Sequence, residues 1–423
     1  MIKSILIFGI LLVFVVHGES RENIHDKPDT STSIHPAMNF LHFWISDGEL
    51  QALDILKQEF IKKRGKWHHV VTKDYQLMKM EASIRSSKGF PVSAMLLLGG
   101  MDIKNITKLN YIQPINKIID YKAEDLLHPV ALNASMNNKQ MMGIPLSMHN
   151  ENWAWYNLHI YEQLNLSLPK TWDEFFLQAP LIVQKGYAPI AVGQDAFSVR
   201  ILFSVLLAGI GGKDTYNQFF LSSSREGLDS IKFQKTLSAF SKIREYAFTR
   251  KLNIWSDATK EVINNRAAMQ IMGDWAKADF LAEGKIIGKD FQCKPAPSAN
   301  KYFLAAVDVI SFSYVKSNAE HLGQKLFIDI LLDNKIQTKF NIVKGATPAI
   351  RTFDIHKLDS CIQSRLPQLE NSQNIIYSPR FLISEKKLFH LQKAIVDFWR
   401  DTNMSTTDLT RNLKEVLQNS VSN

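Results

Sequence analysis

The sequence is poor in cysteine and in metal-binding or nucleophile motifs. Only two cysteines, Cys293 and Cys361, occur in 423 residues, so a chain of this length must be stabilised by hydrophobic cores rather than by a disulfide scaffold. Neither HExxH nor CxxC is present, and the adjacent His68 and His69 would point to opposite faces of a strand. A GxSxG nucleophile motif is also absent. We therefore expect no metal, no cofactor and no catalytic residue of these classes.

Neither sign of charge dominates the sequence. The 50 Lys and Arg residues are set against 41 Asp and Glu residues, which gives a formal net charge of +9. The one notable basic run is Lys62–Lys66. This modest excess is typical of a solvated basic surface, so we expect no nucleic-acid partner.

Long apolar runs are scarce, and the clearest one lies at the N-terminus. Lys3 precedes the uncharged run Ile5–Val16, and small residues follow near Gly18. This pattern predicts a secretory signal peptide over residues 1–18, because the run is too short to span a bilayer. No cysteine follows it, which argues against a lipid anchor. The polar residues 19–36 are expected to form a disordered lead-in to an exported domain.

Two further expectations follow from export. The apolar stretch Arg200–Gly212 is short and ends in glycines, so we expect no later segment to span a membrane. Exported proteins meet an oxidising compartment, where disulfides persist. We expect Cys293 and Cys361 to pair, and two buried free thiols are the alternative.

The first part of the domain predicts alternating strands and helices. Apolar patterning predicts strands over 39–46, 66–73 and 93–99, separated by helices over 47–65 and 77–89. This alternation is typical of a parallel sheet with helices on its faces.

The rest of the chain predicts a second α/β lobe. The aromatic, polar turn Ser147–Trp153 and the segment Val307–Ser311 are the candidate crossing points between lobes. In the middle of the chain, Thr171 and Glu174 form a capping-box pattern that opens a helix. The predicted division is lobe 1 over 37–148 plus about 306–352, and lobe 2 over 149–305 plus about 353–423.

Tryptophans stand beside polar residues at the ends of several predicted elements. Phe43-Trp44 precede a helix start, and Asp274-Trp275 follow the predicted strand Met269–Met272, with Asp274 as a candidate helix cap. Asp308 lies in an apolar strand, where an unpaired carboxylate would be costly. Aromatic faces that stack on sugar C–H groups, with polar groups for the hydroxyls, would suit carbohydrate binding. For each residue taken alone, the alternative is a core tryptophan or a helix cap.

Several of these segments resemble one known family. The stretch HFWISDGELQALDILKQEF (42–60) resembles the opening motif of periplasmic sugar-binding proteins of ABC importers, of the glucose/mannose type. Further segments resemble the same family in the same order: IPLSMHNENWAWYN, LPKTWDEF, AAMQIMGDWAKADF, GKDFQCKPAPS, VDVISF and FNIVKGATPAIR. The resemblance covers about residues 39–360.

The resemblance implies a member of extracellular solute-binding protein family 1. Such a protein has two α/β lobes, each a mixed sheet flanked by helices, with a ligand cleft between them. It is a periplasmic, usually monomeric protein that delivers sugar to an ABC permease and ATPase at the inner membrane. The resemblance also implies a disulfide between Cys293 and Cys361. It places Trp44 and Glu49 at the first strand-to-helix corner, His149 at the crossover, Trp275 as a stacking platform, and Asp308 and Lys344 as hydroxyl-binding residues.

Three segments depart from the family pattern. TKDYQLMK (Thr72–Lys79) replaces a glycine-rich loop, Leu96 stands where a glutamine is usual, and YSPRFLIS (377–384) places Phe381 or a neighbour where a histidine is usual. Phe43 also replaces a tryptophan. These changes remove hydrogen-bonding partners for sugar hydroxyls. We therefore expect a modified, more apolar or larger glycoside rather than glucose.

Two other functions are weighed against a transport receptor. The lost polar contacts would suit an interaction protein that senses a ligand without transporting sugar. A secreted glycosidase would need two carboxylates about 5–10 Å apart across one cleft, and Glu49 and Asp308 are its candidates. The leading prediction is a non-catalytic binding protein.

Overall fold

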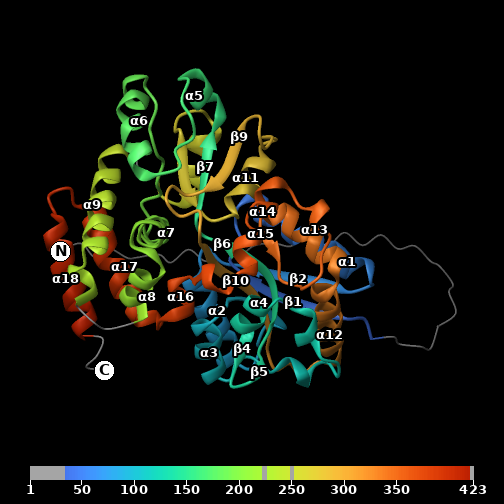
Figure 1. The fold of residues 1–423 in the computed structure, drawn as a ribbon. Helices are drawn as coiled ribbons and strands as arrows, with labels where there is room; N and C mark the ends of the chain where they lie inside the picture. The colour runs from blue at the N-terminus through green and yellow to red at the C-terminus, as the bar shows by residue number, and fades with distance from the viewer. Residues whose placement is uncertain (1–33, 222–225, 248–251, 420–423) are drawn as a thin grey trace, which may run out of the picture. The chain divides into compact units, whose positions relative to one another are not determined.

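A mixed seven-stranded sheet is the larger of the two main sheets in the computed structural model, which describes residues 34–221, 226–247 and 252–419 (Figure 1). The predicted signal peptide, and all but the end of the predicted lead-in, lie outside the described residues. The strand order is β11-β6-β10-β3-β1-β2, with β12 paired to β10. The strands are β1 (Ala37–His42), β2 (Lys66–Val71), β3 (Ala94–Leu98), β6 (Ile144–Asn150), β10 (Phe303–Phe312), β11 (Thr347–Pro348) and β12 (Ile375–Tyr377).

The predicted parallel start of this sheet is confirmed. Strand β1 pairs in parallel with both β2 and β3. Successive side chains of β3 alternate between two cores, with Ala94 and Leu96 on one face and Met95 and Leu97 on the other. Both faces are therefore covered, as expected for parallel strands joined by helices. The helices packed here are α1 (Asp47–Lys62), α2 (Tyr75–Ser87), α3 (Met101–Lys108), α4 (Pro129–Ser135), α12 (Asn318–Leu332) and α13 (Asn334–Lys344).

A second sheet of three antiparallel strands has the order β8-β7-β9. Its strands are β7 (Trp153–Asn157), β8 (Met269–Met272) and β9 (Phe291–Pro295), and a separate small hairpin joins β4 (Met136–Asn137) to β5 (Gln140–Met141). One large core surrounds the three-stranded sheet. The helices in this core are α5 (Leu158–Gln163), α6 (Trp172–Gln184), α7 (Ala196–Leu206), α8 (Gly212–Leu221), α9 (Ile231–Tyr246), α10 (Trp255–Ile263), α11 (Ala276–Ala282), α17 (Glu385–Arg400) and α18 (Thr406–Asn419).

The chain passes between the sheets at two points that differ in how well they were predicted. Strand β6 of the large sheet leads into β7 of the small sheet through Glu151 and Asn152, within the predicted turn. The return from β9 to β10 lies at residues 296–302. The prediction at Val307–Ser311 was wrong, because these residues are inside β10, where both neighbouring strands pair with them.

The stretch around Gly209 is helical. Helix α7, a π-helical turn (Leu207–Gly211) and α8 follow one another without a gap over Ala196–Leu221, a run of 26 residues that is interrupted by the left-handed φ of 81° at Gly212. The expectation that no later segment has the length and composition of a membrane span was therefore wrong, because α8 follows the glycines directly and lengthens the apolar helical run. Two thirds of its most apolar window, 67%, is buried inside the protein, as in the core helix of a globular domain.

The C-terminal segment contributes to the cores of both sheets. Leu358, Ile362 and Leu366 pack in a core of the large sheet, whereas α17 and α18 pack around the small one. Short helices fill this region: α14 (Ser360–Gln363), α15 (Leu366–Glu370) and α16 (Pro379–Leu382). The 3₁₀ turns of the described chain are Ile115–Lys117, Ala123–Leu126, Glu226–Asp229, Ile355–Lys357 and Ser372–Asn374.

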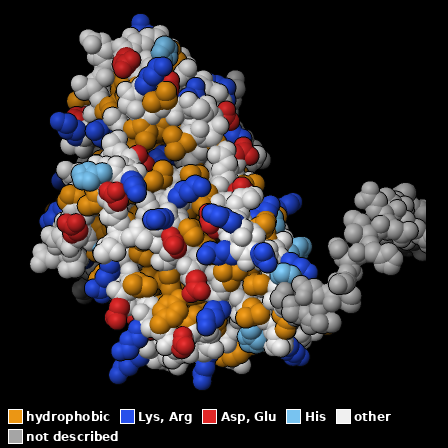
Figure 2. Space-filling model, turned by 90° about the vertical axis from the view of Figure 1, so that its right-hand side faces the viewer, with side chains coloured by type: hydrophobic (Ala, Val, Ile, Leu, Met, Phe, Trp, Pro, Cys, Tyr) orange, Lys and Arg blue, Asp and Glu red, His pale blue; other side chains and the backbone are white. Residues whose placement is uncertain are grey.

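The surface carries charges of both signs. Lys and Arg side chains lie among Asp, Glu and apolar side chains on the face shown in Figure 2. This mixture agrees with the balanced composition of the sequence.

Candidate functional site

The first strand-to-helix corner places Trp44 and Glu49 at the carboxyl end of β1. Ser46 caps α1 by accepting a hydrogen bond from the amide of Glu49, at 3.3 Å. One oxygen of Glu49 accepts from the amides of Ile45 and Ser46, at 3.1 and 3.3 Å. This reciprocal capping box fixes the carboxylate beside the corner and leaves its second oxygen for another partner.

Lys344 supplies that partner from the end of α13. Its ammonium lies 2.8 Å from Oε1 of Glu49 and 5.4 Å from the centre of the Trp44 ring. The helix ends at Gly345, whose φ of 93° is in the left-handed region that favours glycine. The lysine is therefore both ion-paired and placed over an aromatic face.

His149 joins the two sheets. It lies near the end of β6, with its Nδ1 2.6 Å from Asp274, which follows β8, and its Nε2 3.1 Å from Asp308 of β10. A bulge between Asp308 and Val309 shifts the β10–β6 register beside this carboxylate, and such bulges redirect side chains. The costly buried Asp308 predicted from the sequence thus has a cationic partner.

The two carboxylates control the protonation of His149. Burial alone lowers the pKa of His149, but the charges of Asp274 and Asp308 outweigh it and raise the pKa to about 9. Burial in turn favours protonated Asp308, whereas the charge on His149 and a smaller contribution from Lys344 lower the pKa of Asp308 overall. A charged imidazolium between carboxylates is therefore the neutral-pH state of this group.

Trp275 stands at the corner between β8 and α11. Its ring lies 5.4 Å from that of His149 and 5.7 Å from that of Phe197. A Cβ at Gly273 would come within 2.2 Å of the indole, so only glycine allows the ring to fold back over the chain. The prediction that Asp274 caps the following helix was wrong, because its side chain binds His149 and the amide of Asn150 instead.

The residues predicted from the sequence meet in one buried group, here called the edge cluster: Trp44, Glu49, His149, Trp275, Asp308 and Lys344. All are at most 8% exposed. Trp44 and Lys344 both stabilise the charge of Asp308, which connects the Glu49 side of the cluster to the His149 side. Residues far apart in sequence, from both sheets, therefore converge where the chain crosses between the sheets.

Sequence reasoning missed two acidic members of this region. Asp274 was taken for a cap, although its place after a buried strand was a signal for a site. Asp279 lies on the buried face of α11, and burial raises its pKa to about 6 while Ser46 and Gly48 of the first corner partly offset that rise. An acidic residue beside an apolar helix face was the available signal.

The predicted disulfide between Cys293 and Cys361 is present. It links β9 to α14, next to Asp359, which pairs with the buried Lys277. Within the ranges that the structure describes, no group of three or more His, Cys, Asp or Glu side chains is arranged to hold a metal ion.

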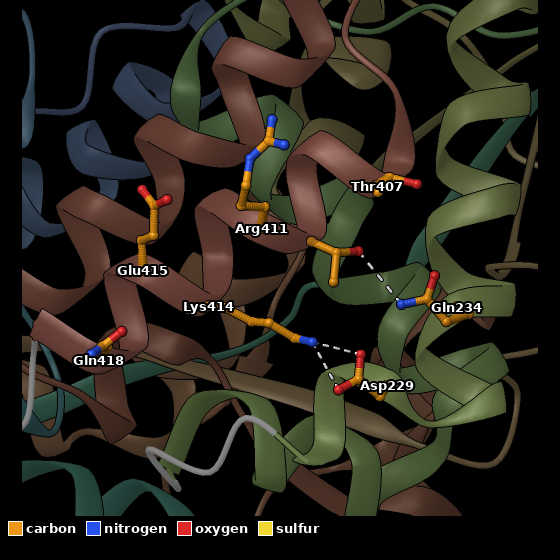
Figure 3. Close-up of a pocket in the computed structure, with 8 residues that line it drawn as sticks. Asp229, Gln234, Thr407, Arg411, Lys414, Glu415 and Gln418 are labelled. Carbon is orange, nitrogen blue, oxygen red and sulfur yellow. Dashed lines mark hydrogen bonds and ion pairs between the residues drawn. The ribbon is translucent and has the colours of Figure 1, made fainter.

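A surface groove lies apart from the edge cluster. A groove of about 500 Å³ runs between α9 and α18 and is already crossed by an ion pair between Lys414 and Asp229, 2.7 Å long (Figure 3). Gln234 and Thr410 also hydrogen-bond across it, at 3.5 Å. Its lining is polar and contains no member of the edge cluster, so it does not compete with that cluster as a site.

Comparison with known families decides the class of the protein. Residues 74–337, more than half of the chain, match the family model described as bacterial extracellular solute-binding protein. The chain belongs to this family. The matched range includes His149, Trp275 and Asp308 of the edge cluster. In this solute-binding protein, Trp44 and Glu49 precede the matched range and Lys344 follows it.

Relatives agree with this family. A probable sugar-binding periplasmic protein of Rhizobium meliloti is 26% identical over 76% of this chain and 78% of its own length. An uncharacterized ABC transporter extracellular-binding protein of Pyrococcus horikoshii is 25% identical over 98% of this chain and 96% of its own length. A chitin oligosaccharide binding protein has the same fold, with a TM-score of 0.78 at 17% identity, covering 92% of this chain and 100% of that one.

The fold prediction is confirmed, and the glycosidase alternative is not supported. The solute-binding protein has the α/β periplasmic binding protein fold, and its family binds solutes rather than converting them. Glu49 is held by Lys344 and by backbone amides, and Asp308 is held by His149. The two candidate acids of a glycosidase thus serve as partners within the edge cluster.

Proposed function

We propose that the protein captures a saccharide between two lobes and delivers it to the permease and ATPase of an ABC importer. The proposed lobes are residues 37–148 plus about 306–352, and 149–305 plus about 353–423, although the stretch 358–377 packs with the large sheet. The observation that carries the proposal is the hydrogen bond between His149 of the large sheet and Asp274, which follows β8 of the small sheet, beside the ring of Trp275. An interface of stacking faces and charged hydrogen-bonding groups suits a polyhydroxylated ring.

Closure couples binding to transport. The members of the edge cluster pair with one another and are nearly inaccessible to water. A ligand reaches them only when the elements that carry them move apart, and its binding then favours the closed arrangement. The permease can therefore distinguish loaded from empty protein by lobe position.

Further details of the proposal come from the sequence. The protein is a periplasmic monomer whose signal peptide is cleaved and which lacks a lipid anchor. Its ligand is a modified, more apolar or larger glycoside rather than glucose, because the segments around Thr72–Lys79, Leu96 and Phe381 differ from those usual in glucose-type members. The probable sugar-binding relatives support the saccharide class.

Thermal unfolding with a panel of neutral, modified and oligomeric saccharides tests this function. A ligand at 100 times its dissociation constant should stabilise the protein by about 2.7 kcal/mol. Trp275→Ala should remove that stabilisation. Trp67→Ala, which truncates a tryptophan packed against Phe60 and Phe327 away from the cluster, should lower the melting temperature but keep the ligand response.

The same unfolding experiment also distinguishes a transport receptor from an interaction protein. A response to unmodified glucose alone would contradict the larger or modified ligand. No response to any saccharide would contradict the proposed function and favour an interaction protein that uses the fold without transporting sugar.

A further inference from the structure

Two of the segments that depart from the family motifs, Thr72–Lys79 and 377–384, meet in space beside the edge cluster. With Asp102 and Glu385 they form a second group, here called the Tyr75 cluster, at the carboxyl ends of β1 and β3: Tyr75, Lys79, Asp102, Arg380 and Glu385. Lys79 and Arg380 both lie over the Tyr75 ring, at 4.9 and 5.6 Å from its centre. Charged side chains therefore gather around one aromatic ring at the edge where α/β sheets bind ligands.

The Tyr75 cluster adjoins the edge cluster directly. The hydroxyl of Tyr75 accepts a hydrogen bond from the amide of Leu98, at 3.2 Å, and Leu98 is paired with Asp308 across β3 and β10. The Tyr75 ring also contacts that of Phe43, at 5.0 Å, the residue before Trp44. Neighbouring strands are about 4.8 Å apart, so one ligand can touch both groups.

Arg380 differs from the other cations of this region. Lys79 lies 2.5 Å from Glu385 and 3.7 Å from Asp102. No nitrogen of Arg380 forms a hydrogen bond or an ion pair with another residue in the described ranges, and its Nε is buried. A buried donor without an acceptor is costly, and a guanidinium fork matches carboxylate or phosphate oxygens in pairs.

We propose that Arg380 forms a subsite for an anionic group, so that the ligand is an acidic saccharide that carries a carboxylate or a phosphate. The proposal rests on the proposed function and narrows it to a substrate class. The sugar ring lies against the edge cluster, and its acidic group accepts hydrogen bonds from the Arg380 guanidinium.

The neighbouring carboxylates do not prevent this arrangement. Glu385 is held by Lys79. Burial raises the pKa of Asp102, although Lys79 and Arg380 reduce that rise, and one of its oxygens has no hydrogen-bond partner. Asp102 lies 3.7 Å from Lys79, so both carboxylates have a cation other than Arg380 beside them.

Calorimetric titration of the whole mature protein with matched ligands tests the subsite. The ligands are glucose, glucuronic acid, glucose 6-phosphate, cellobiose, cellobiouronic acid and inorganic phosphate. We expect tighter binding of an acidic ligand than of its neutral counterpart, with an advantage that falls as salt is added. Comparison of the glucuronic acid and phosphate arms identifies which anionic group is bound.

The variants are Arg380→Gln, Arg380→Lys and a control, Arg85→Gln. Arg85 lies on α2, the helix that carries Tyr75, and pairs with Glu81 at 2.6 Å. Arg85→Gln therefore removes one positive charge, as Arg380→Gln does, but from a residue outside the Tyr75 cluster. Arg380→Gln should lower the affinity for the acidic ligand about 10- to 100-fold and leave the neutral counterpart unchanged. Arg380→Lys should retain part of the affinity, and Arg85→Gln should retain all of it.

Three results would overturn the proposal, and they are distinguishable. Equal binding of acidic and neutral ligands, or no effect of Arg380→Gln, would reject the acidic class while leaving saccharide binding intact. If inorganic phosphate binds as tightly as the sugar phosphate, the site binds anions and the sugar ring contributes nothing to the affinity. Binding of none of the saccharides would reject the subsite together with the proposed function.

Discussion

The edge cluster and the Tyr75 cluster lie at the same edge of one sheet and differ in how their charges are satisfied. In the edge cluster, Glu49 pairs with Lys344, and His149 pairs with two carboxylates. In the Tyr75 cluster, no described residue accepts a hydrogen bond from Arg380, and none donates one to Oδ2 of Asp102. The charges of the edge cluster are paired with one another in this arrangement, whereas the Tyr75 cluster retains groups that can form hydrogen bonds with a ligand.

This difference separates two tasks. A network of paired charges holds the elements of two sheets in one arrangement, and removal of a member leaves a partner buried and unpaired. Unpaired groups add little to stability and are free to select a ligand. Stability should therefore depend on the edge cluster, and ligand choice on the Tyr75 cluster.

The largest expected effect comes from His149→Ala. This change leaves Asp274 and Asp308 buried without their cation, so the free energy of unfolding should fall by about 3–5 kcal/mol. Urea denaturation at pH 7 measures the loss, and His356→Ala, at an exposed position, is the neutral control. A loss no larger than that of the control would show that the edge cluster does not stabilise the fold.

The second prediction concerns alkaline pH. Since the pKa of His149 is raised to about 9 from an ordinary value near 6.5, its stabilisation is complete below 6.5 and is lost as pH rises through about 9. The loss should be about 3 kcal/mol at most. Denaturation curves between pH 6 and 10 measure it, and His149→Gln should flatten the dependence. An equal slope in that variant would assign the effect to other groups.

The third prediction concerns acid pH and a different histidine. His42 is buried, accepts a hydrogen bond from the amide of Trp44, and its Nε2 lies 2.9 Å from Nδ1 of His69. Burial and the neighbouring His69 lower the pKa of His42 to about 4. Its neutral form therefore stabilises the protein above about 6.5, and the stabilisation, about 3 kcal/mol at most, is lost as pH falls through 4. His42→Gln should weaken the acid dependence and leave the alkaline one.

A smaller effect is expected for Lys344→Met. Glu49 loses its cation but keeps the amides of Ile45 and Ser46, so the cost should be about 2 kcal/mol. The control is Lys357→Met, which breaks an exposed pair with Asp354, 3.8 Å long, and should cost less than about 1 kcal/mol. Equal losses in the two variants would contradict a special role for the buried pair.

The smallest effect on stability is expected for Arg380→Met. Among the described residues this side chain has no hydrogen bond to lose, only its contact with the Tyr75 ring and its charge near Asp102, so the change should stay within about 1 kcal/mol. Arg200→Met is the sharp contrast, because two nitrogens of Arg200 each lie 3.1 Å from buried Glu151 and the loss should be about 3–5 kcal/mol. Similar losses would remove the distinction between the two clusters.

Local patterns in the sequence predicted much of the fold. Alternating apolar runs predicted β1, β2 and β3, and the resemblance to solute-binding proteins predicted the pairing of Cys293 with Cys361. The same motifs named residues that meet in the edge cluster, although their roles toward a ligand stay a prediction. Polar residues at strand ends were informative because strands of one sheet bring their ends together.

Long-range geometry was beyond those patterns. Asp274 could not be told from a helix cap, since the choice depends on the distance to His149 in another sheet. The glycines near Gly209 suggested an end to the apolar run, but a π turn and α8 follow α7 directly and pack in the same core, with a left-handed φ at Gly212 between them. Arg380 and Tyr75 are about 300 positions apart in the numbering, and no local pattern brings them together.

The bond between Cys293 and Cys361 has a mechanical consequence. Cys293 belongs to β9 of the small sheet, whereas Leu358 and Ile362, on either side of Cys361, are anchored in a core of the large sheet. The distance between these two points is fixed by a covalent link. In the proposed opening of the lobes, this bond limits separation of the two segments near Cys361, so we expect the motion there to be a rotation rather than a translation.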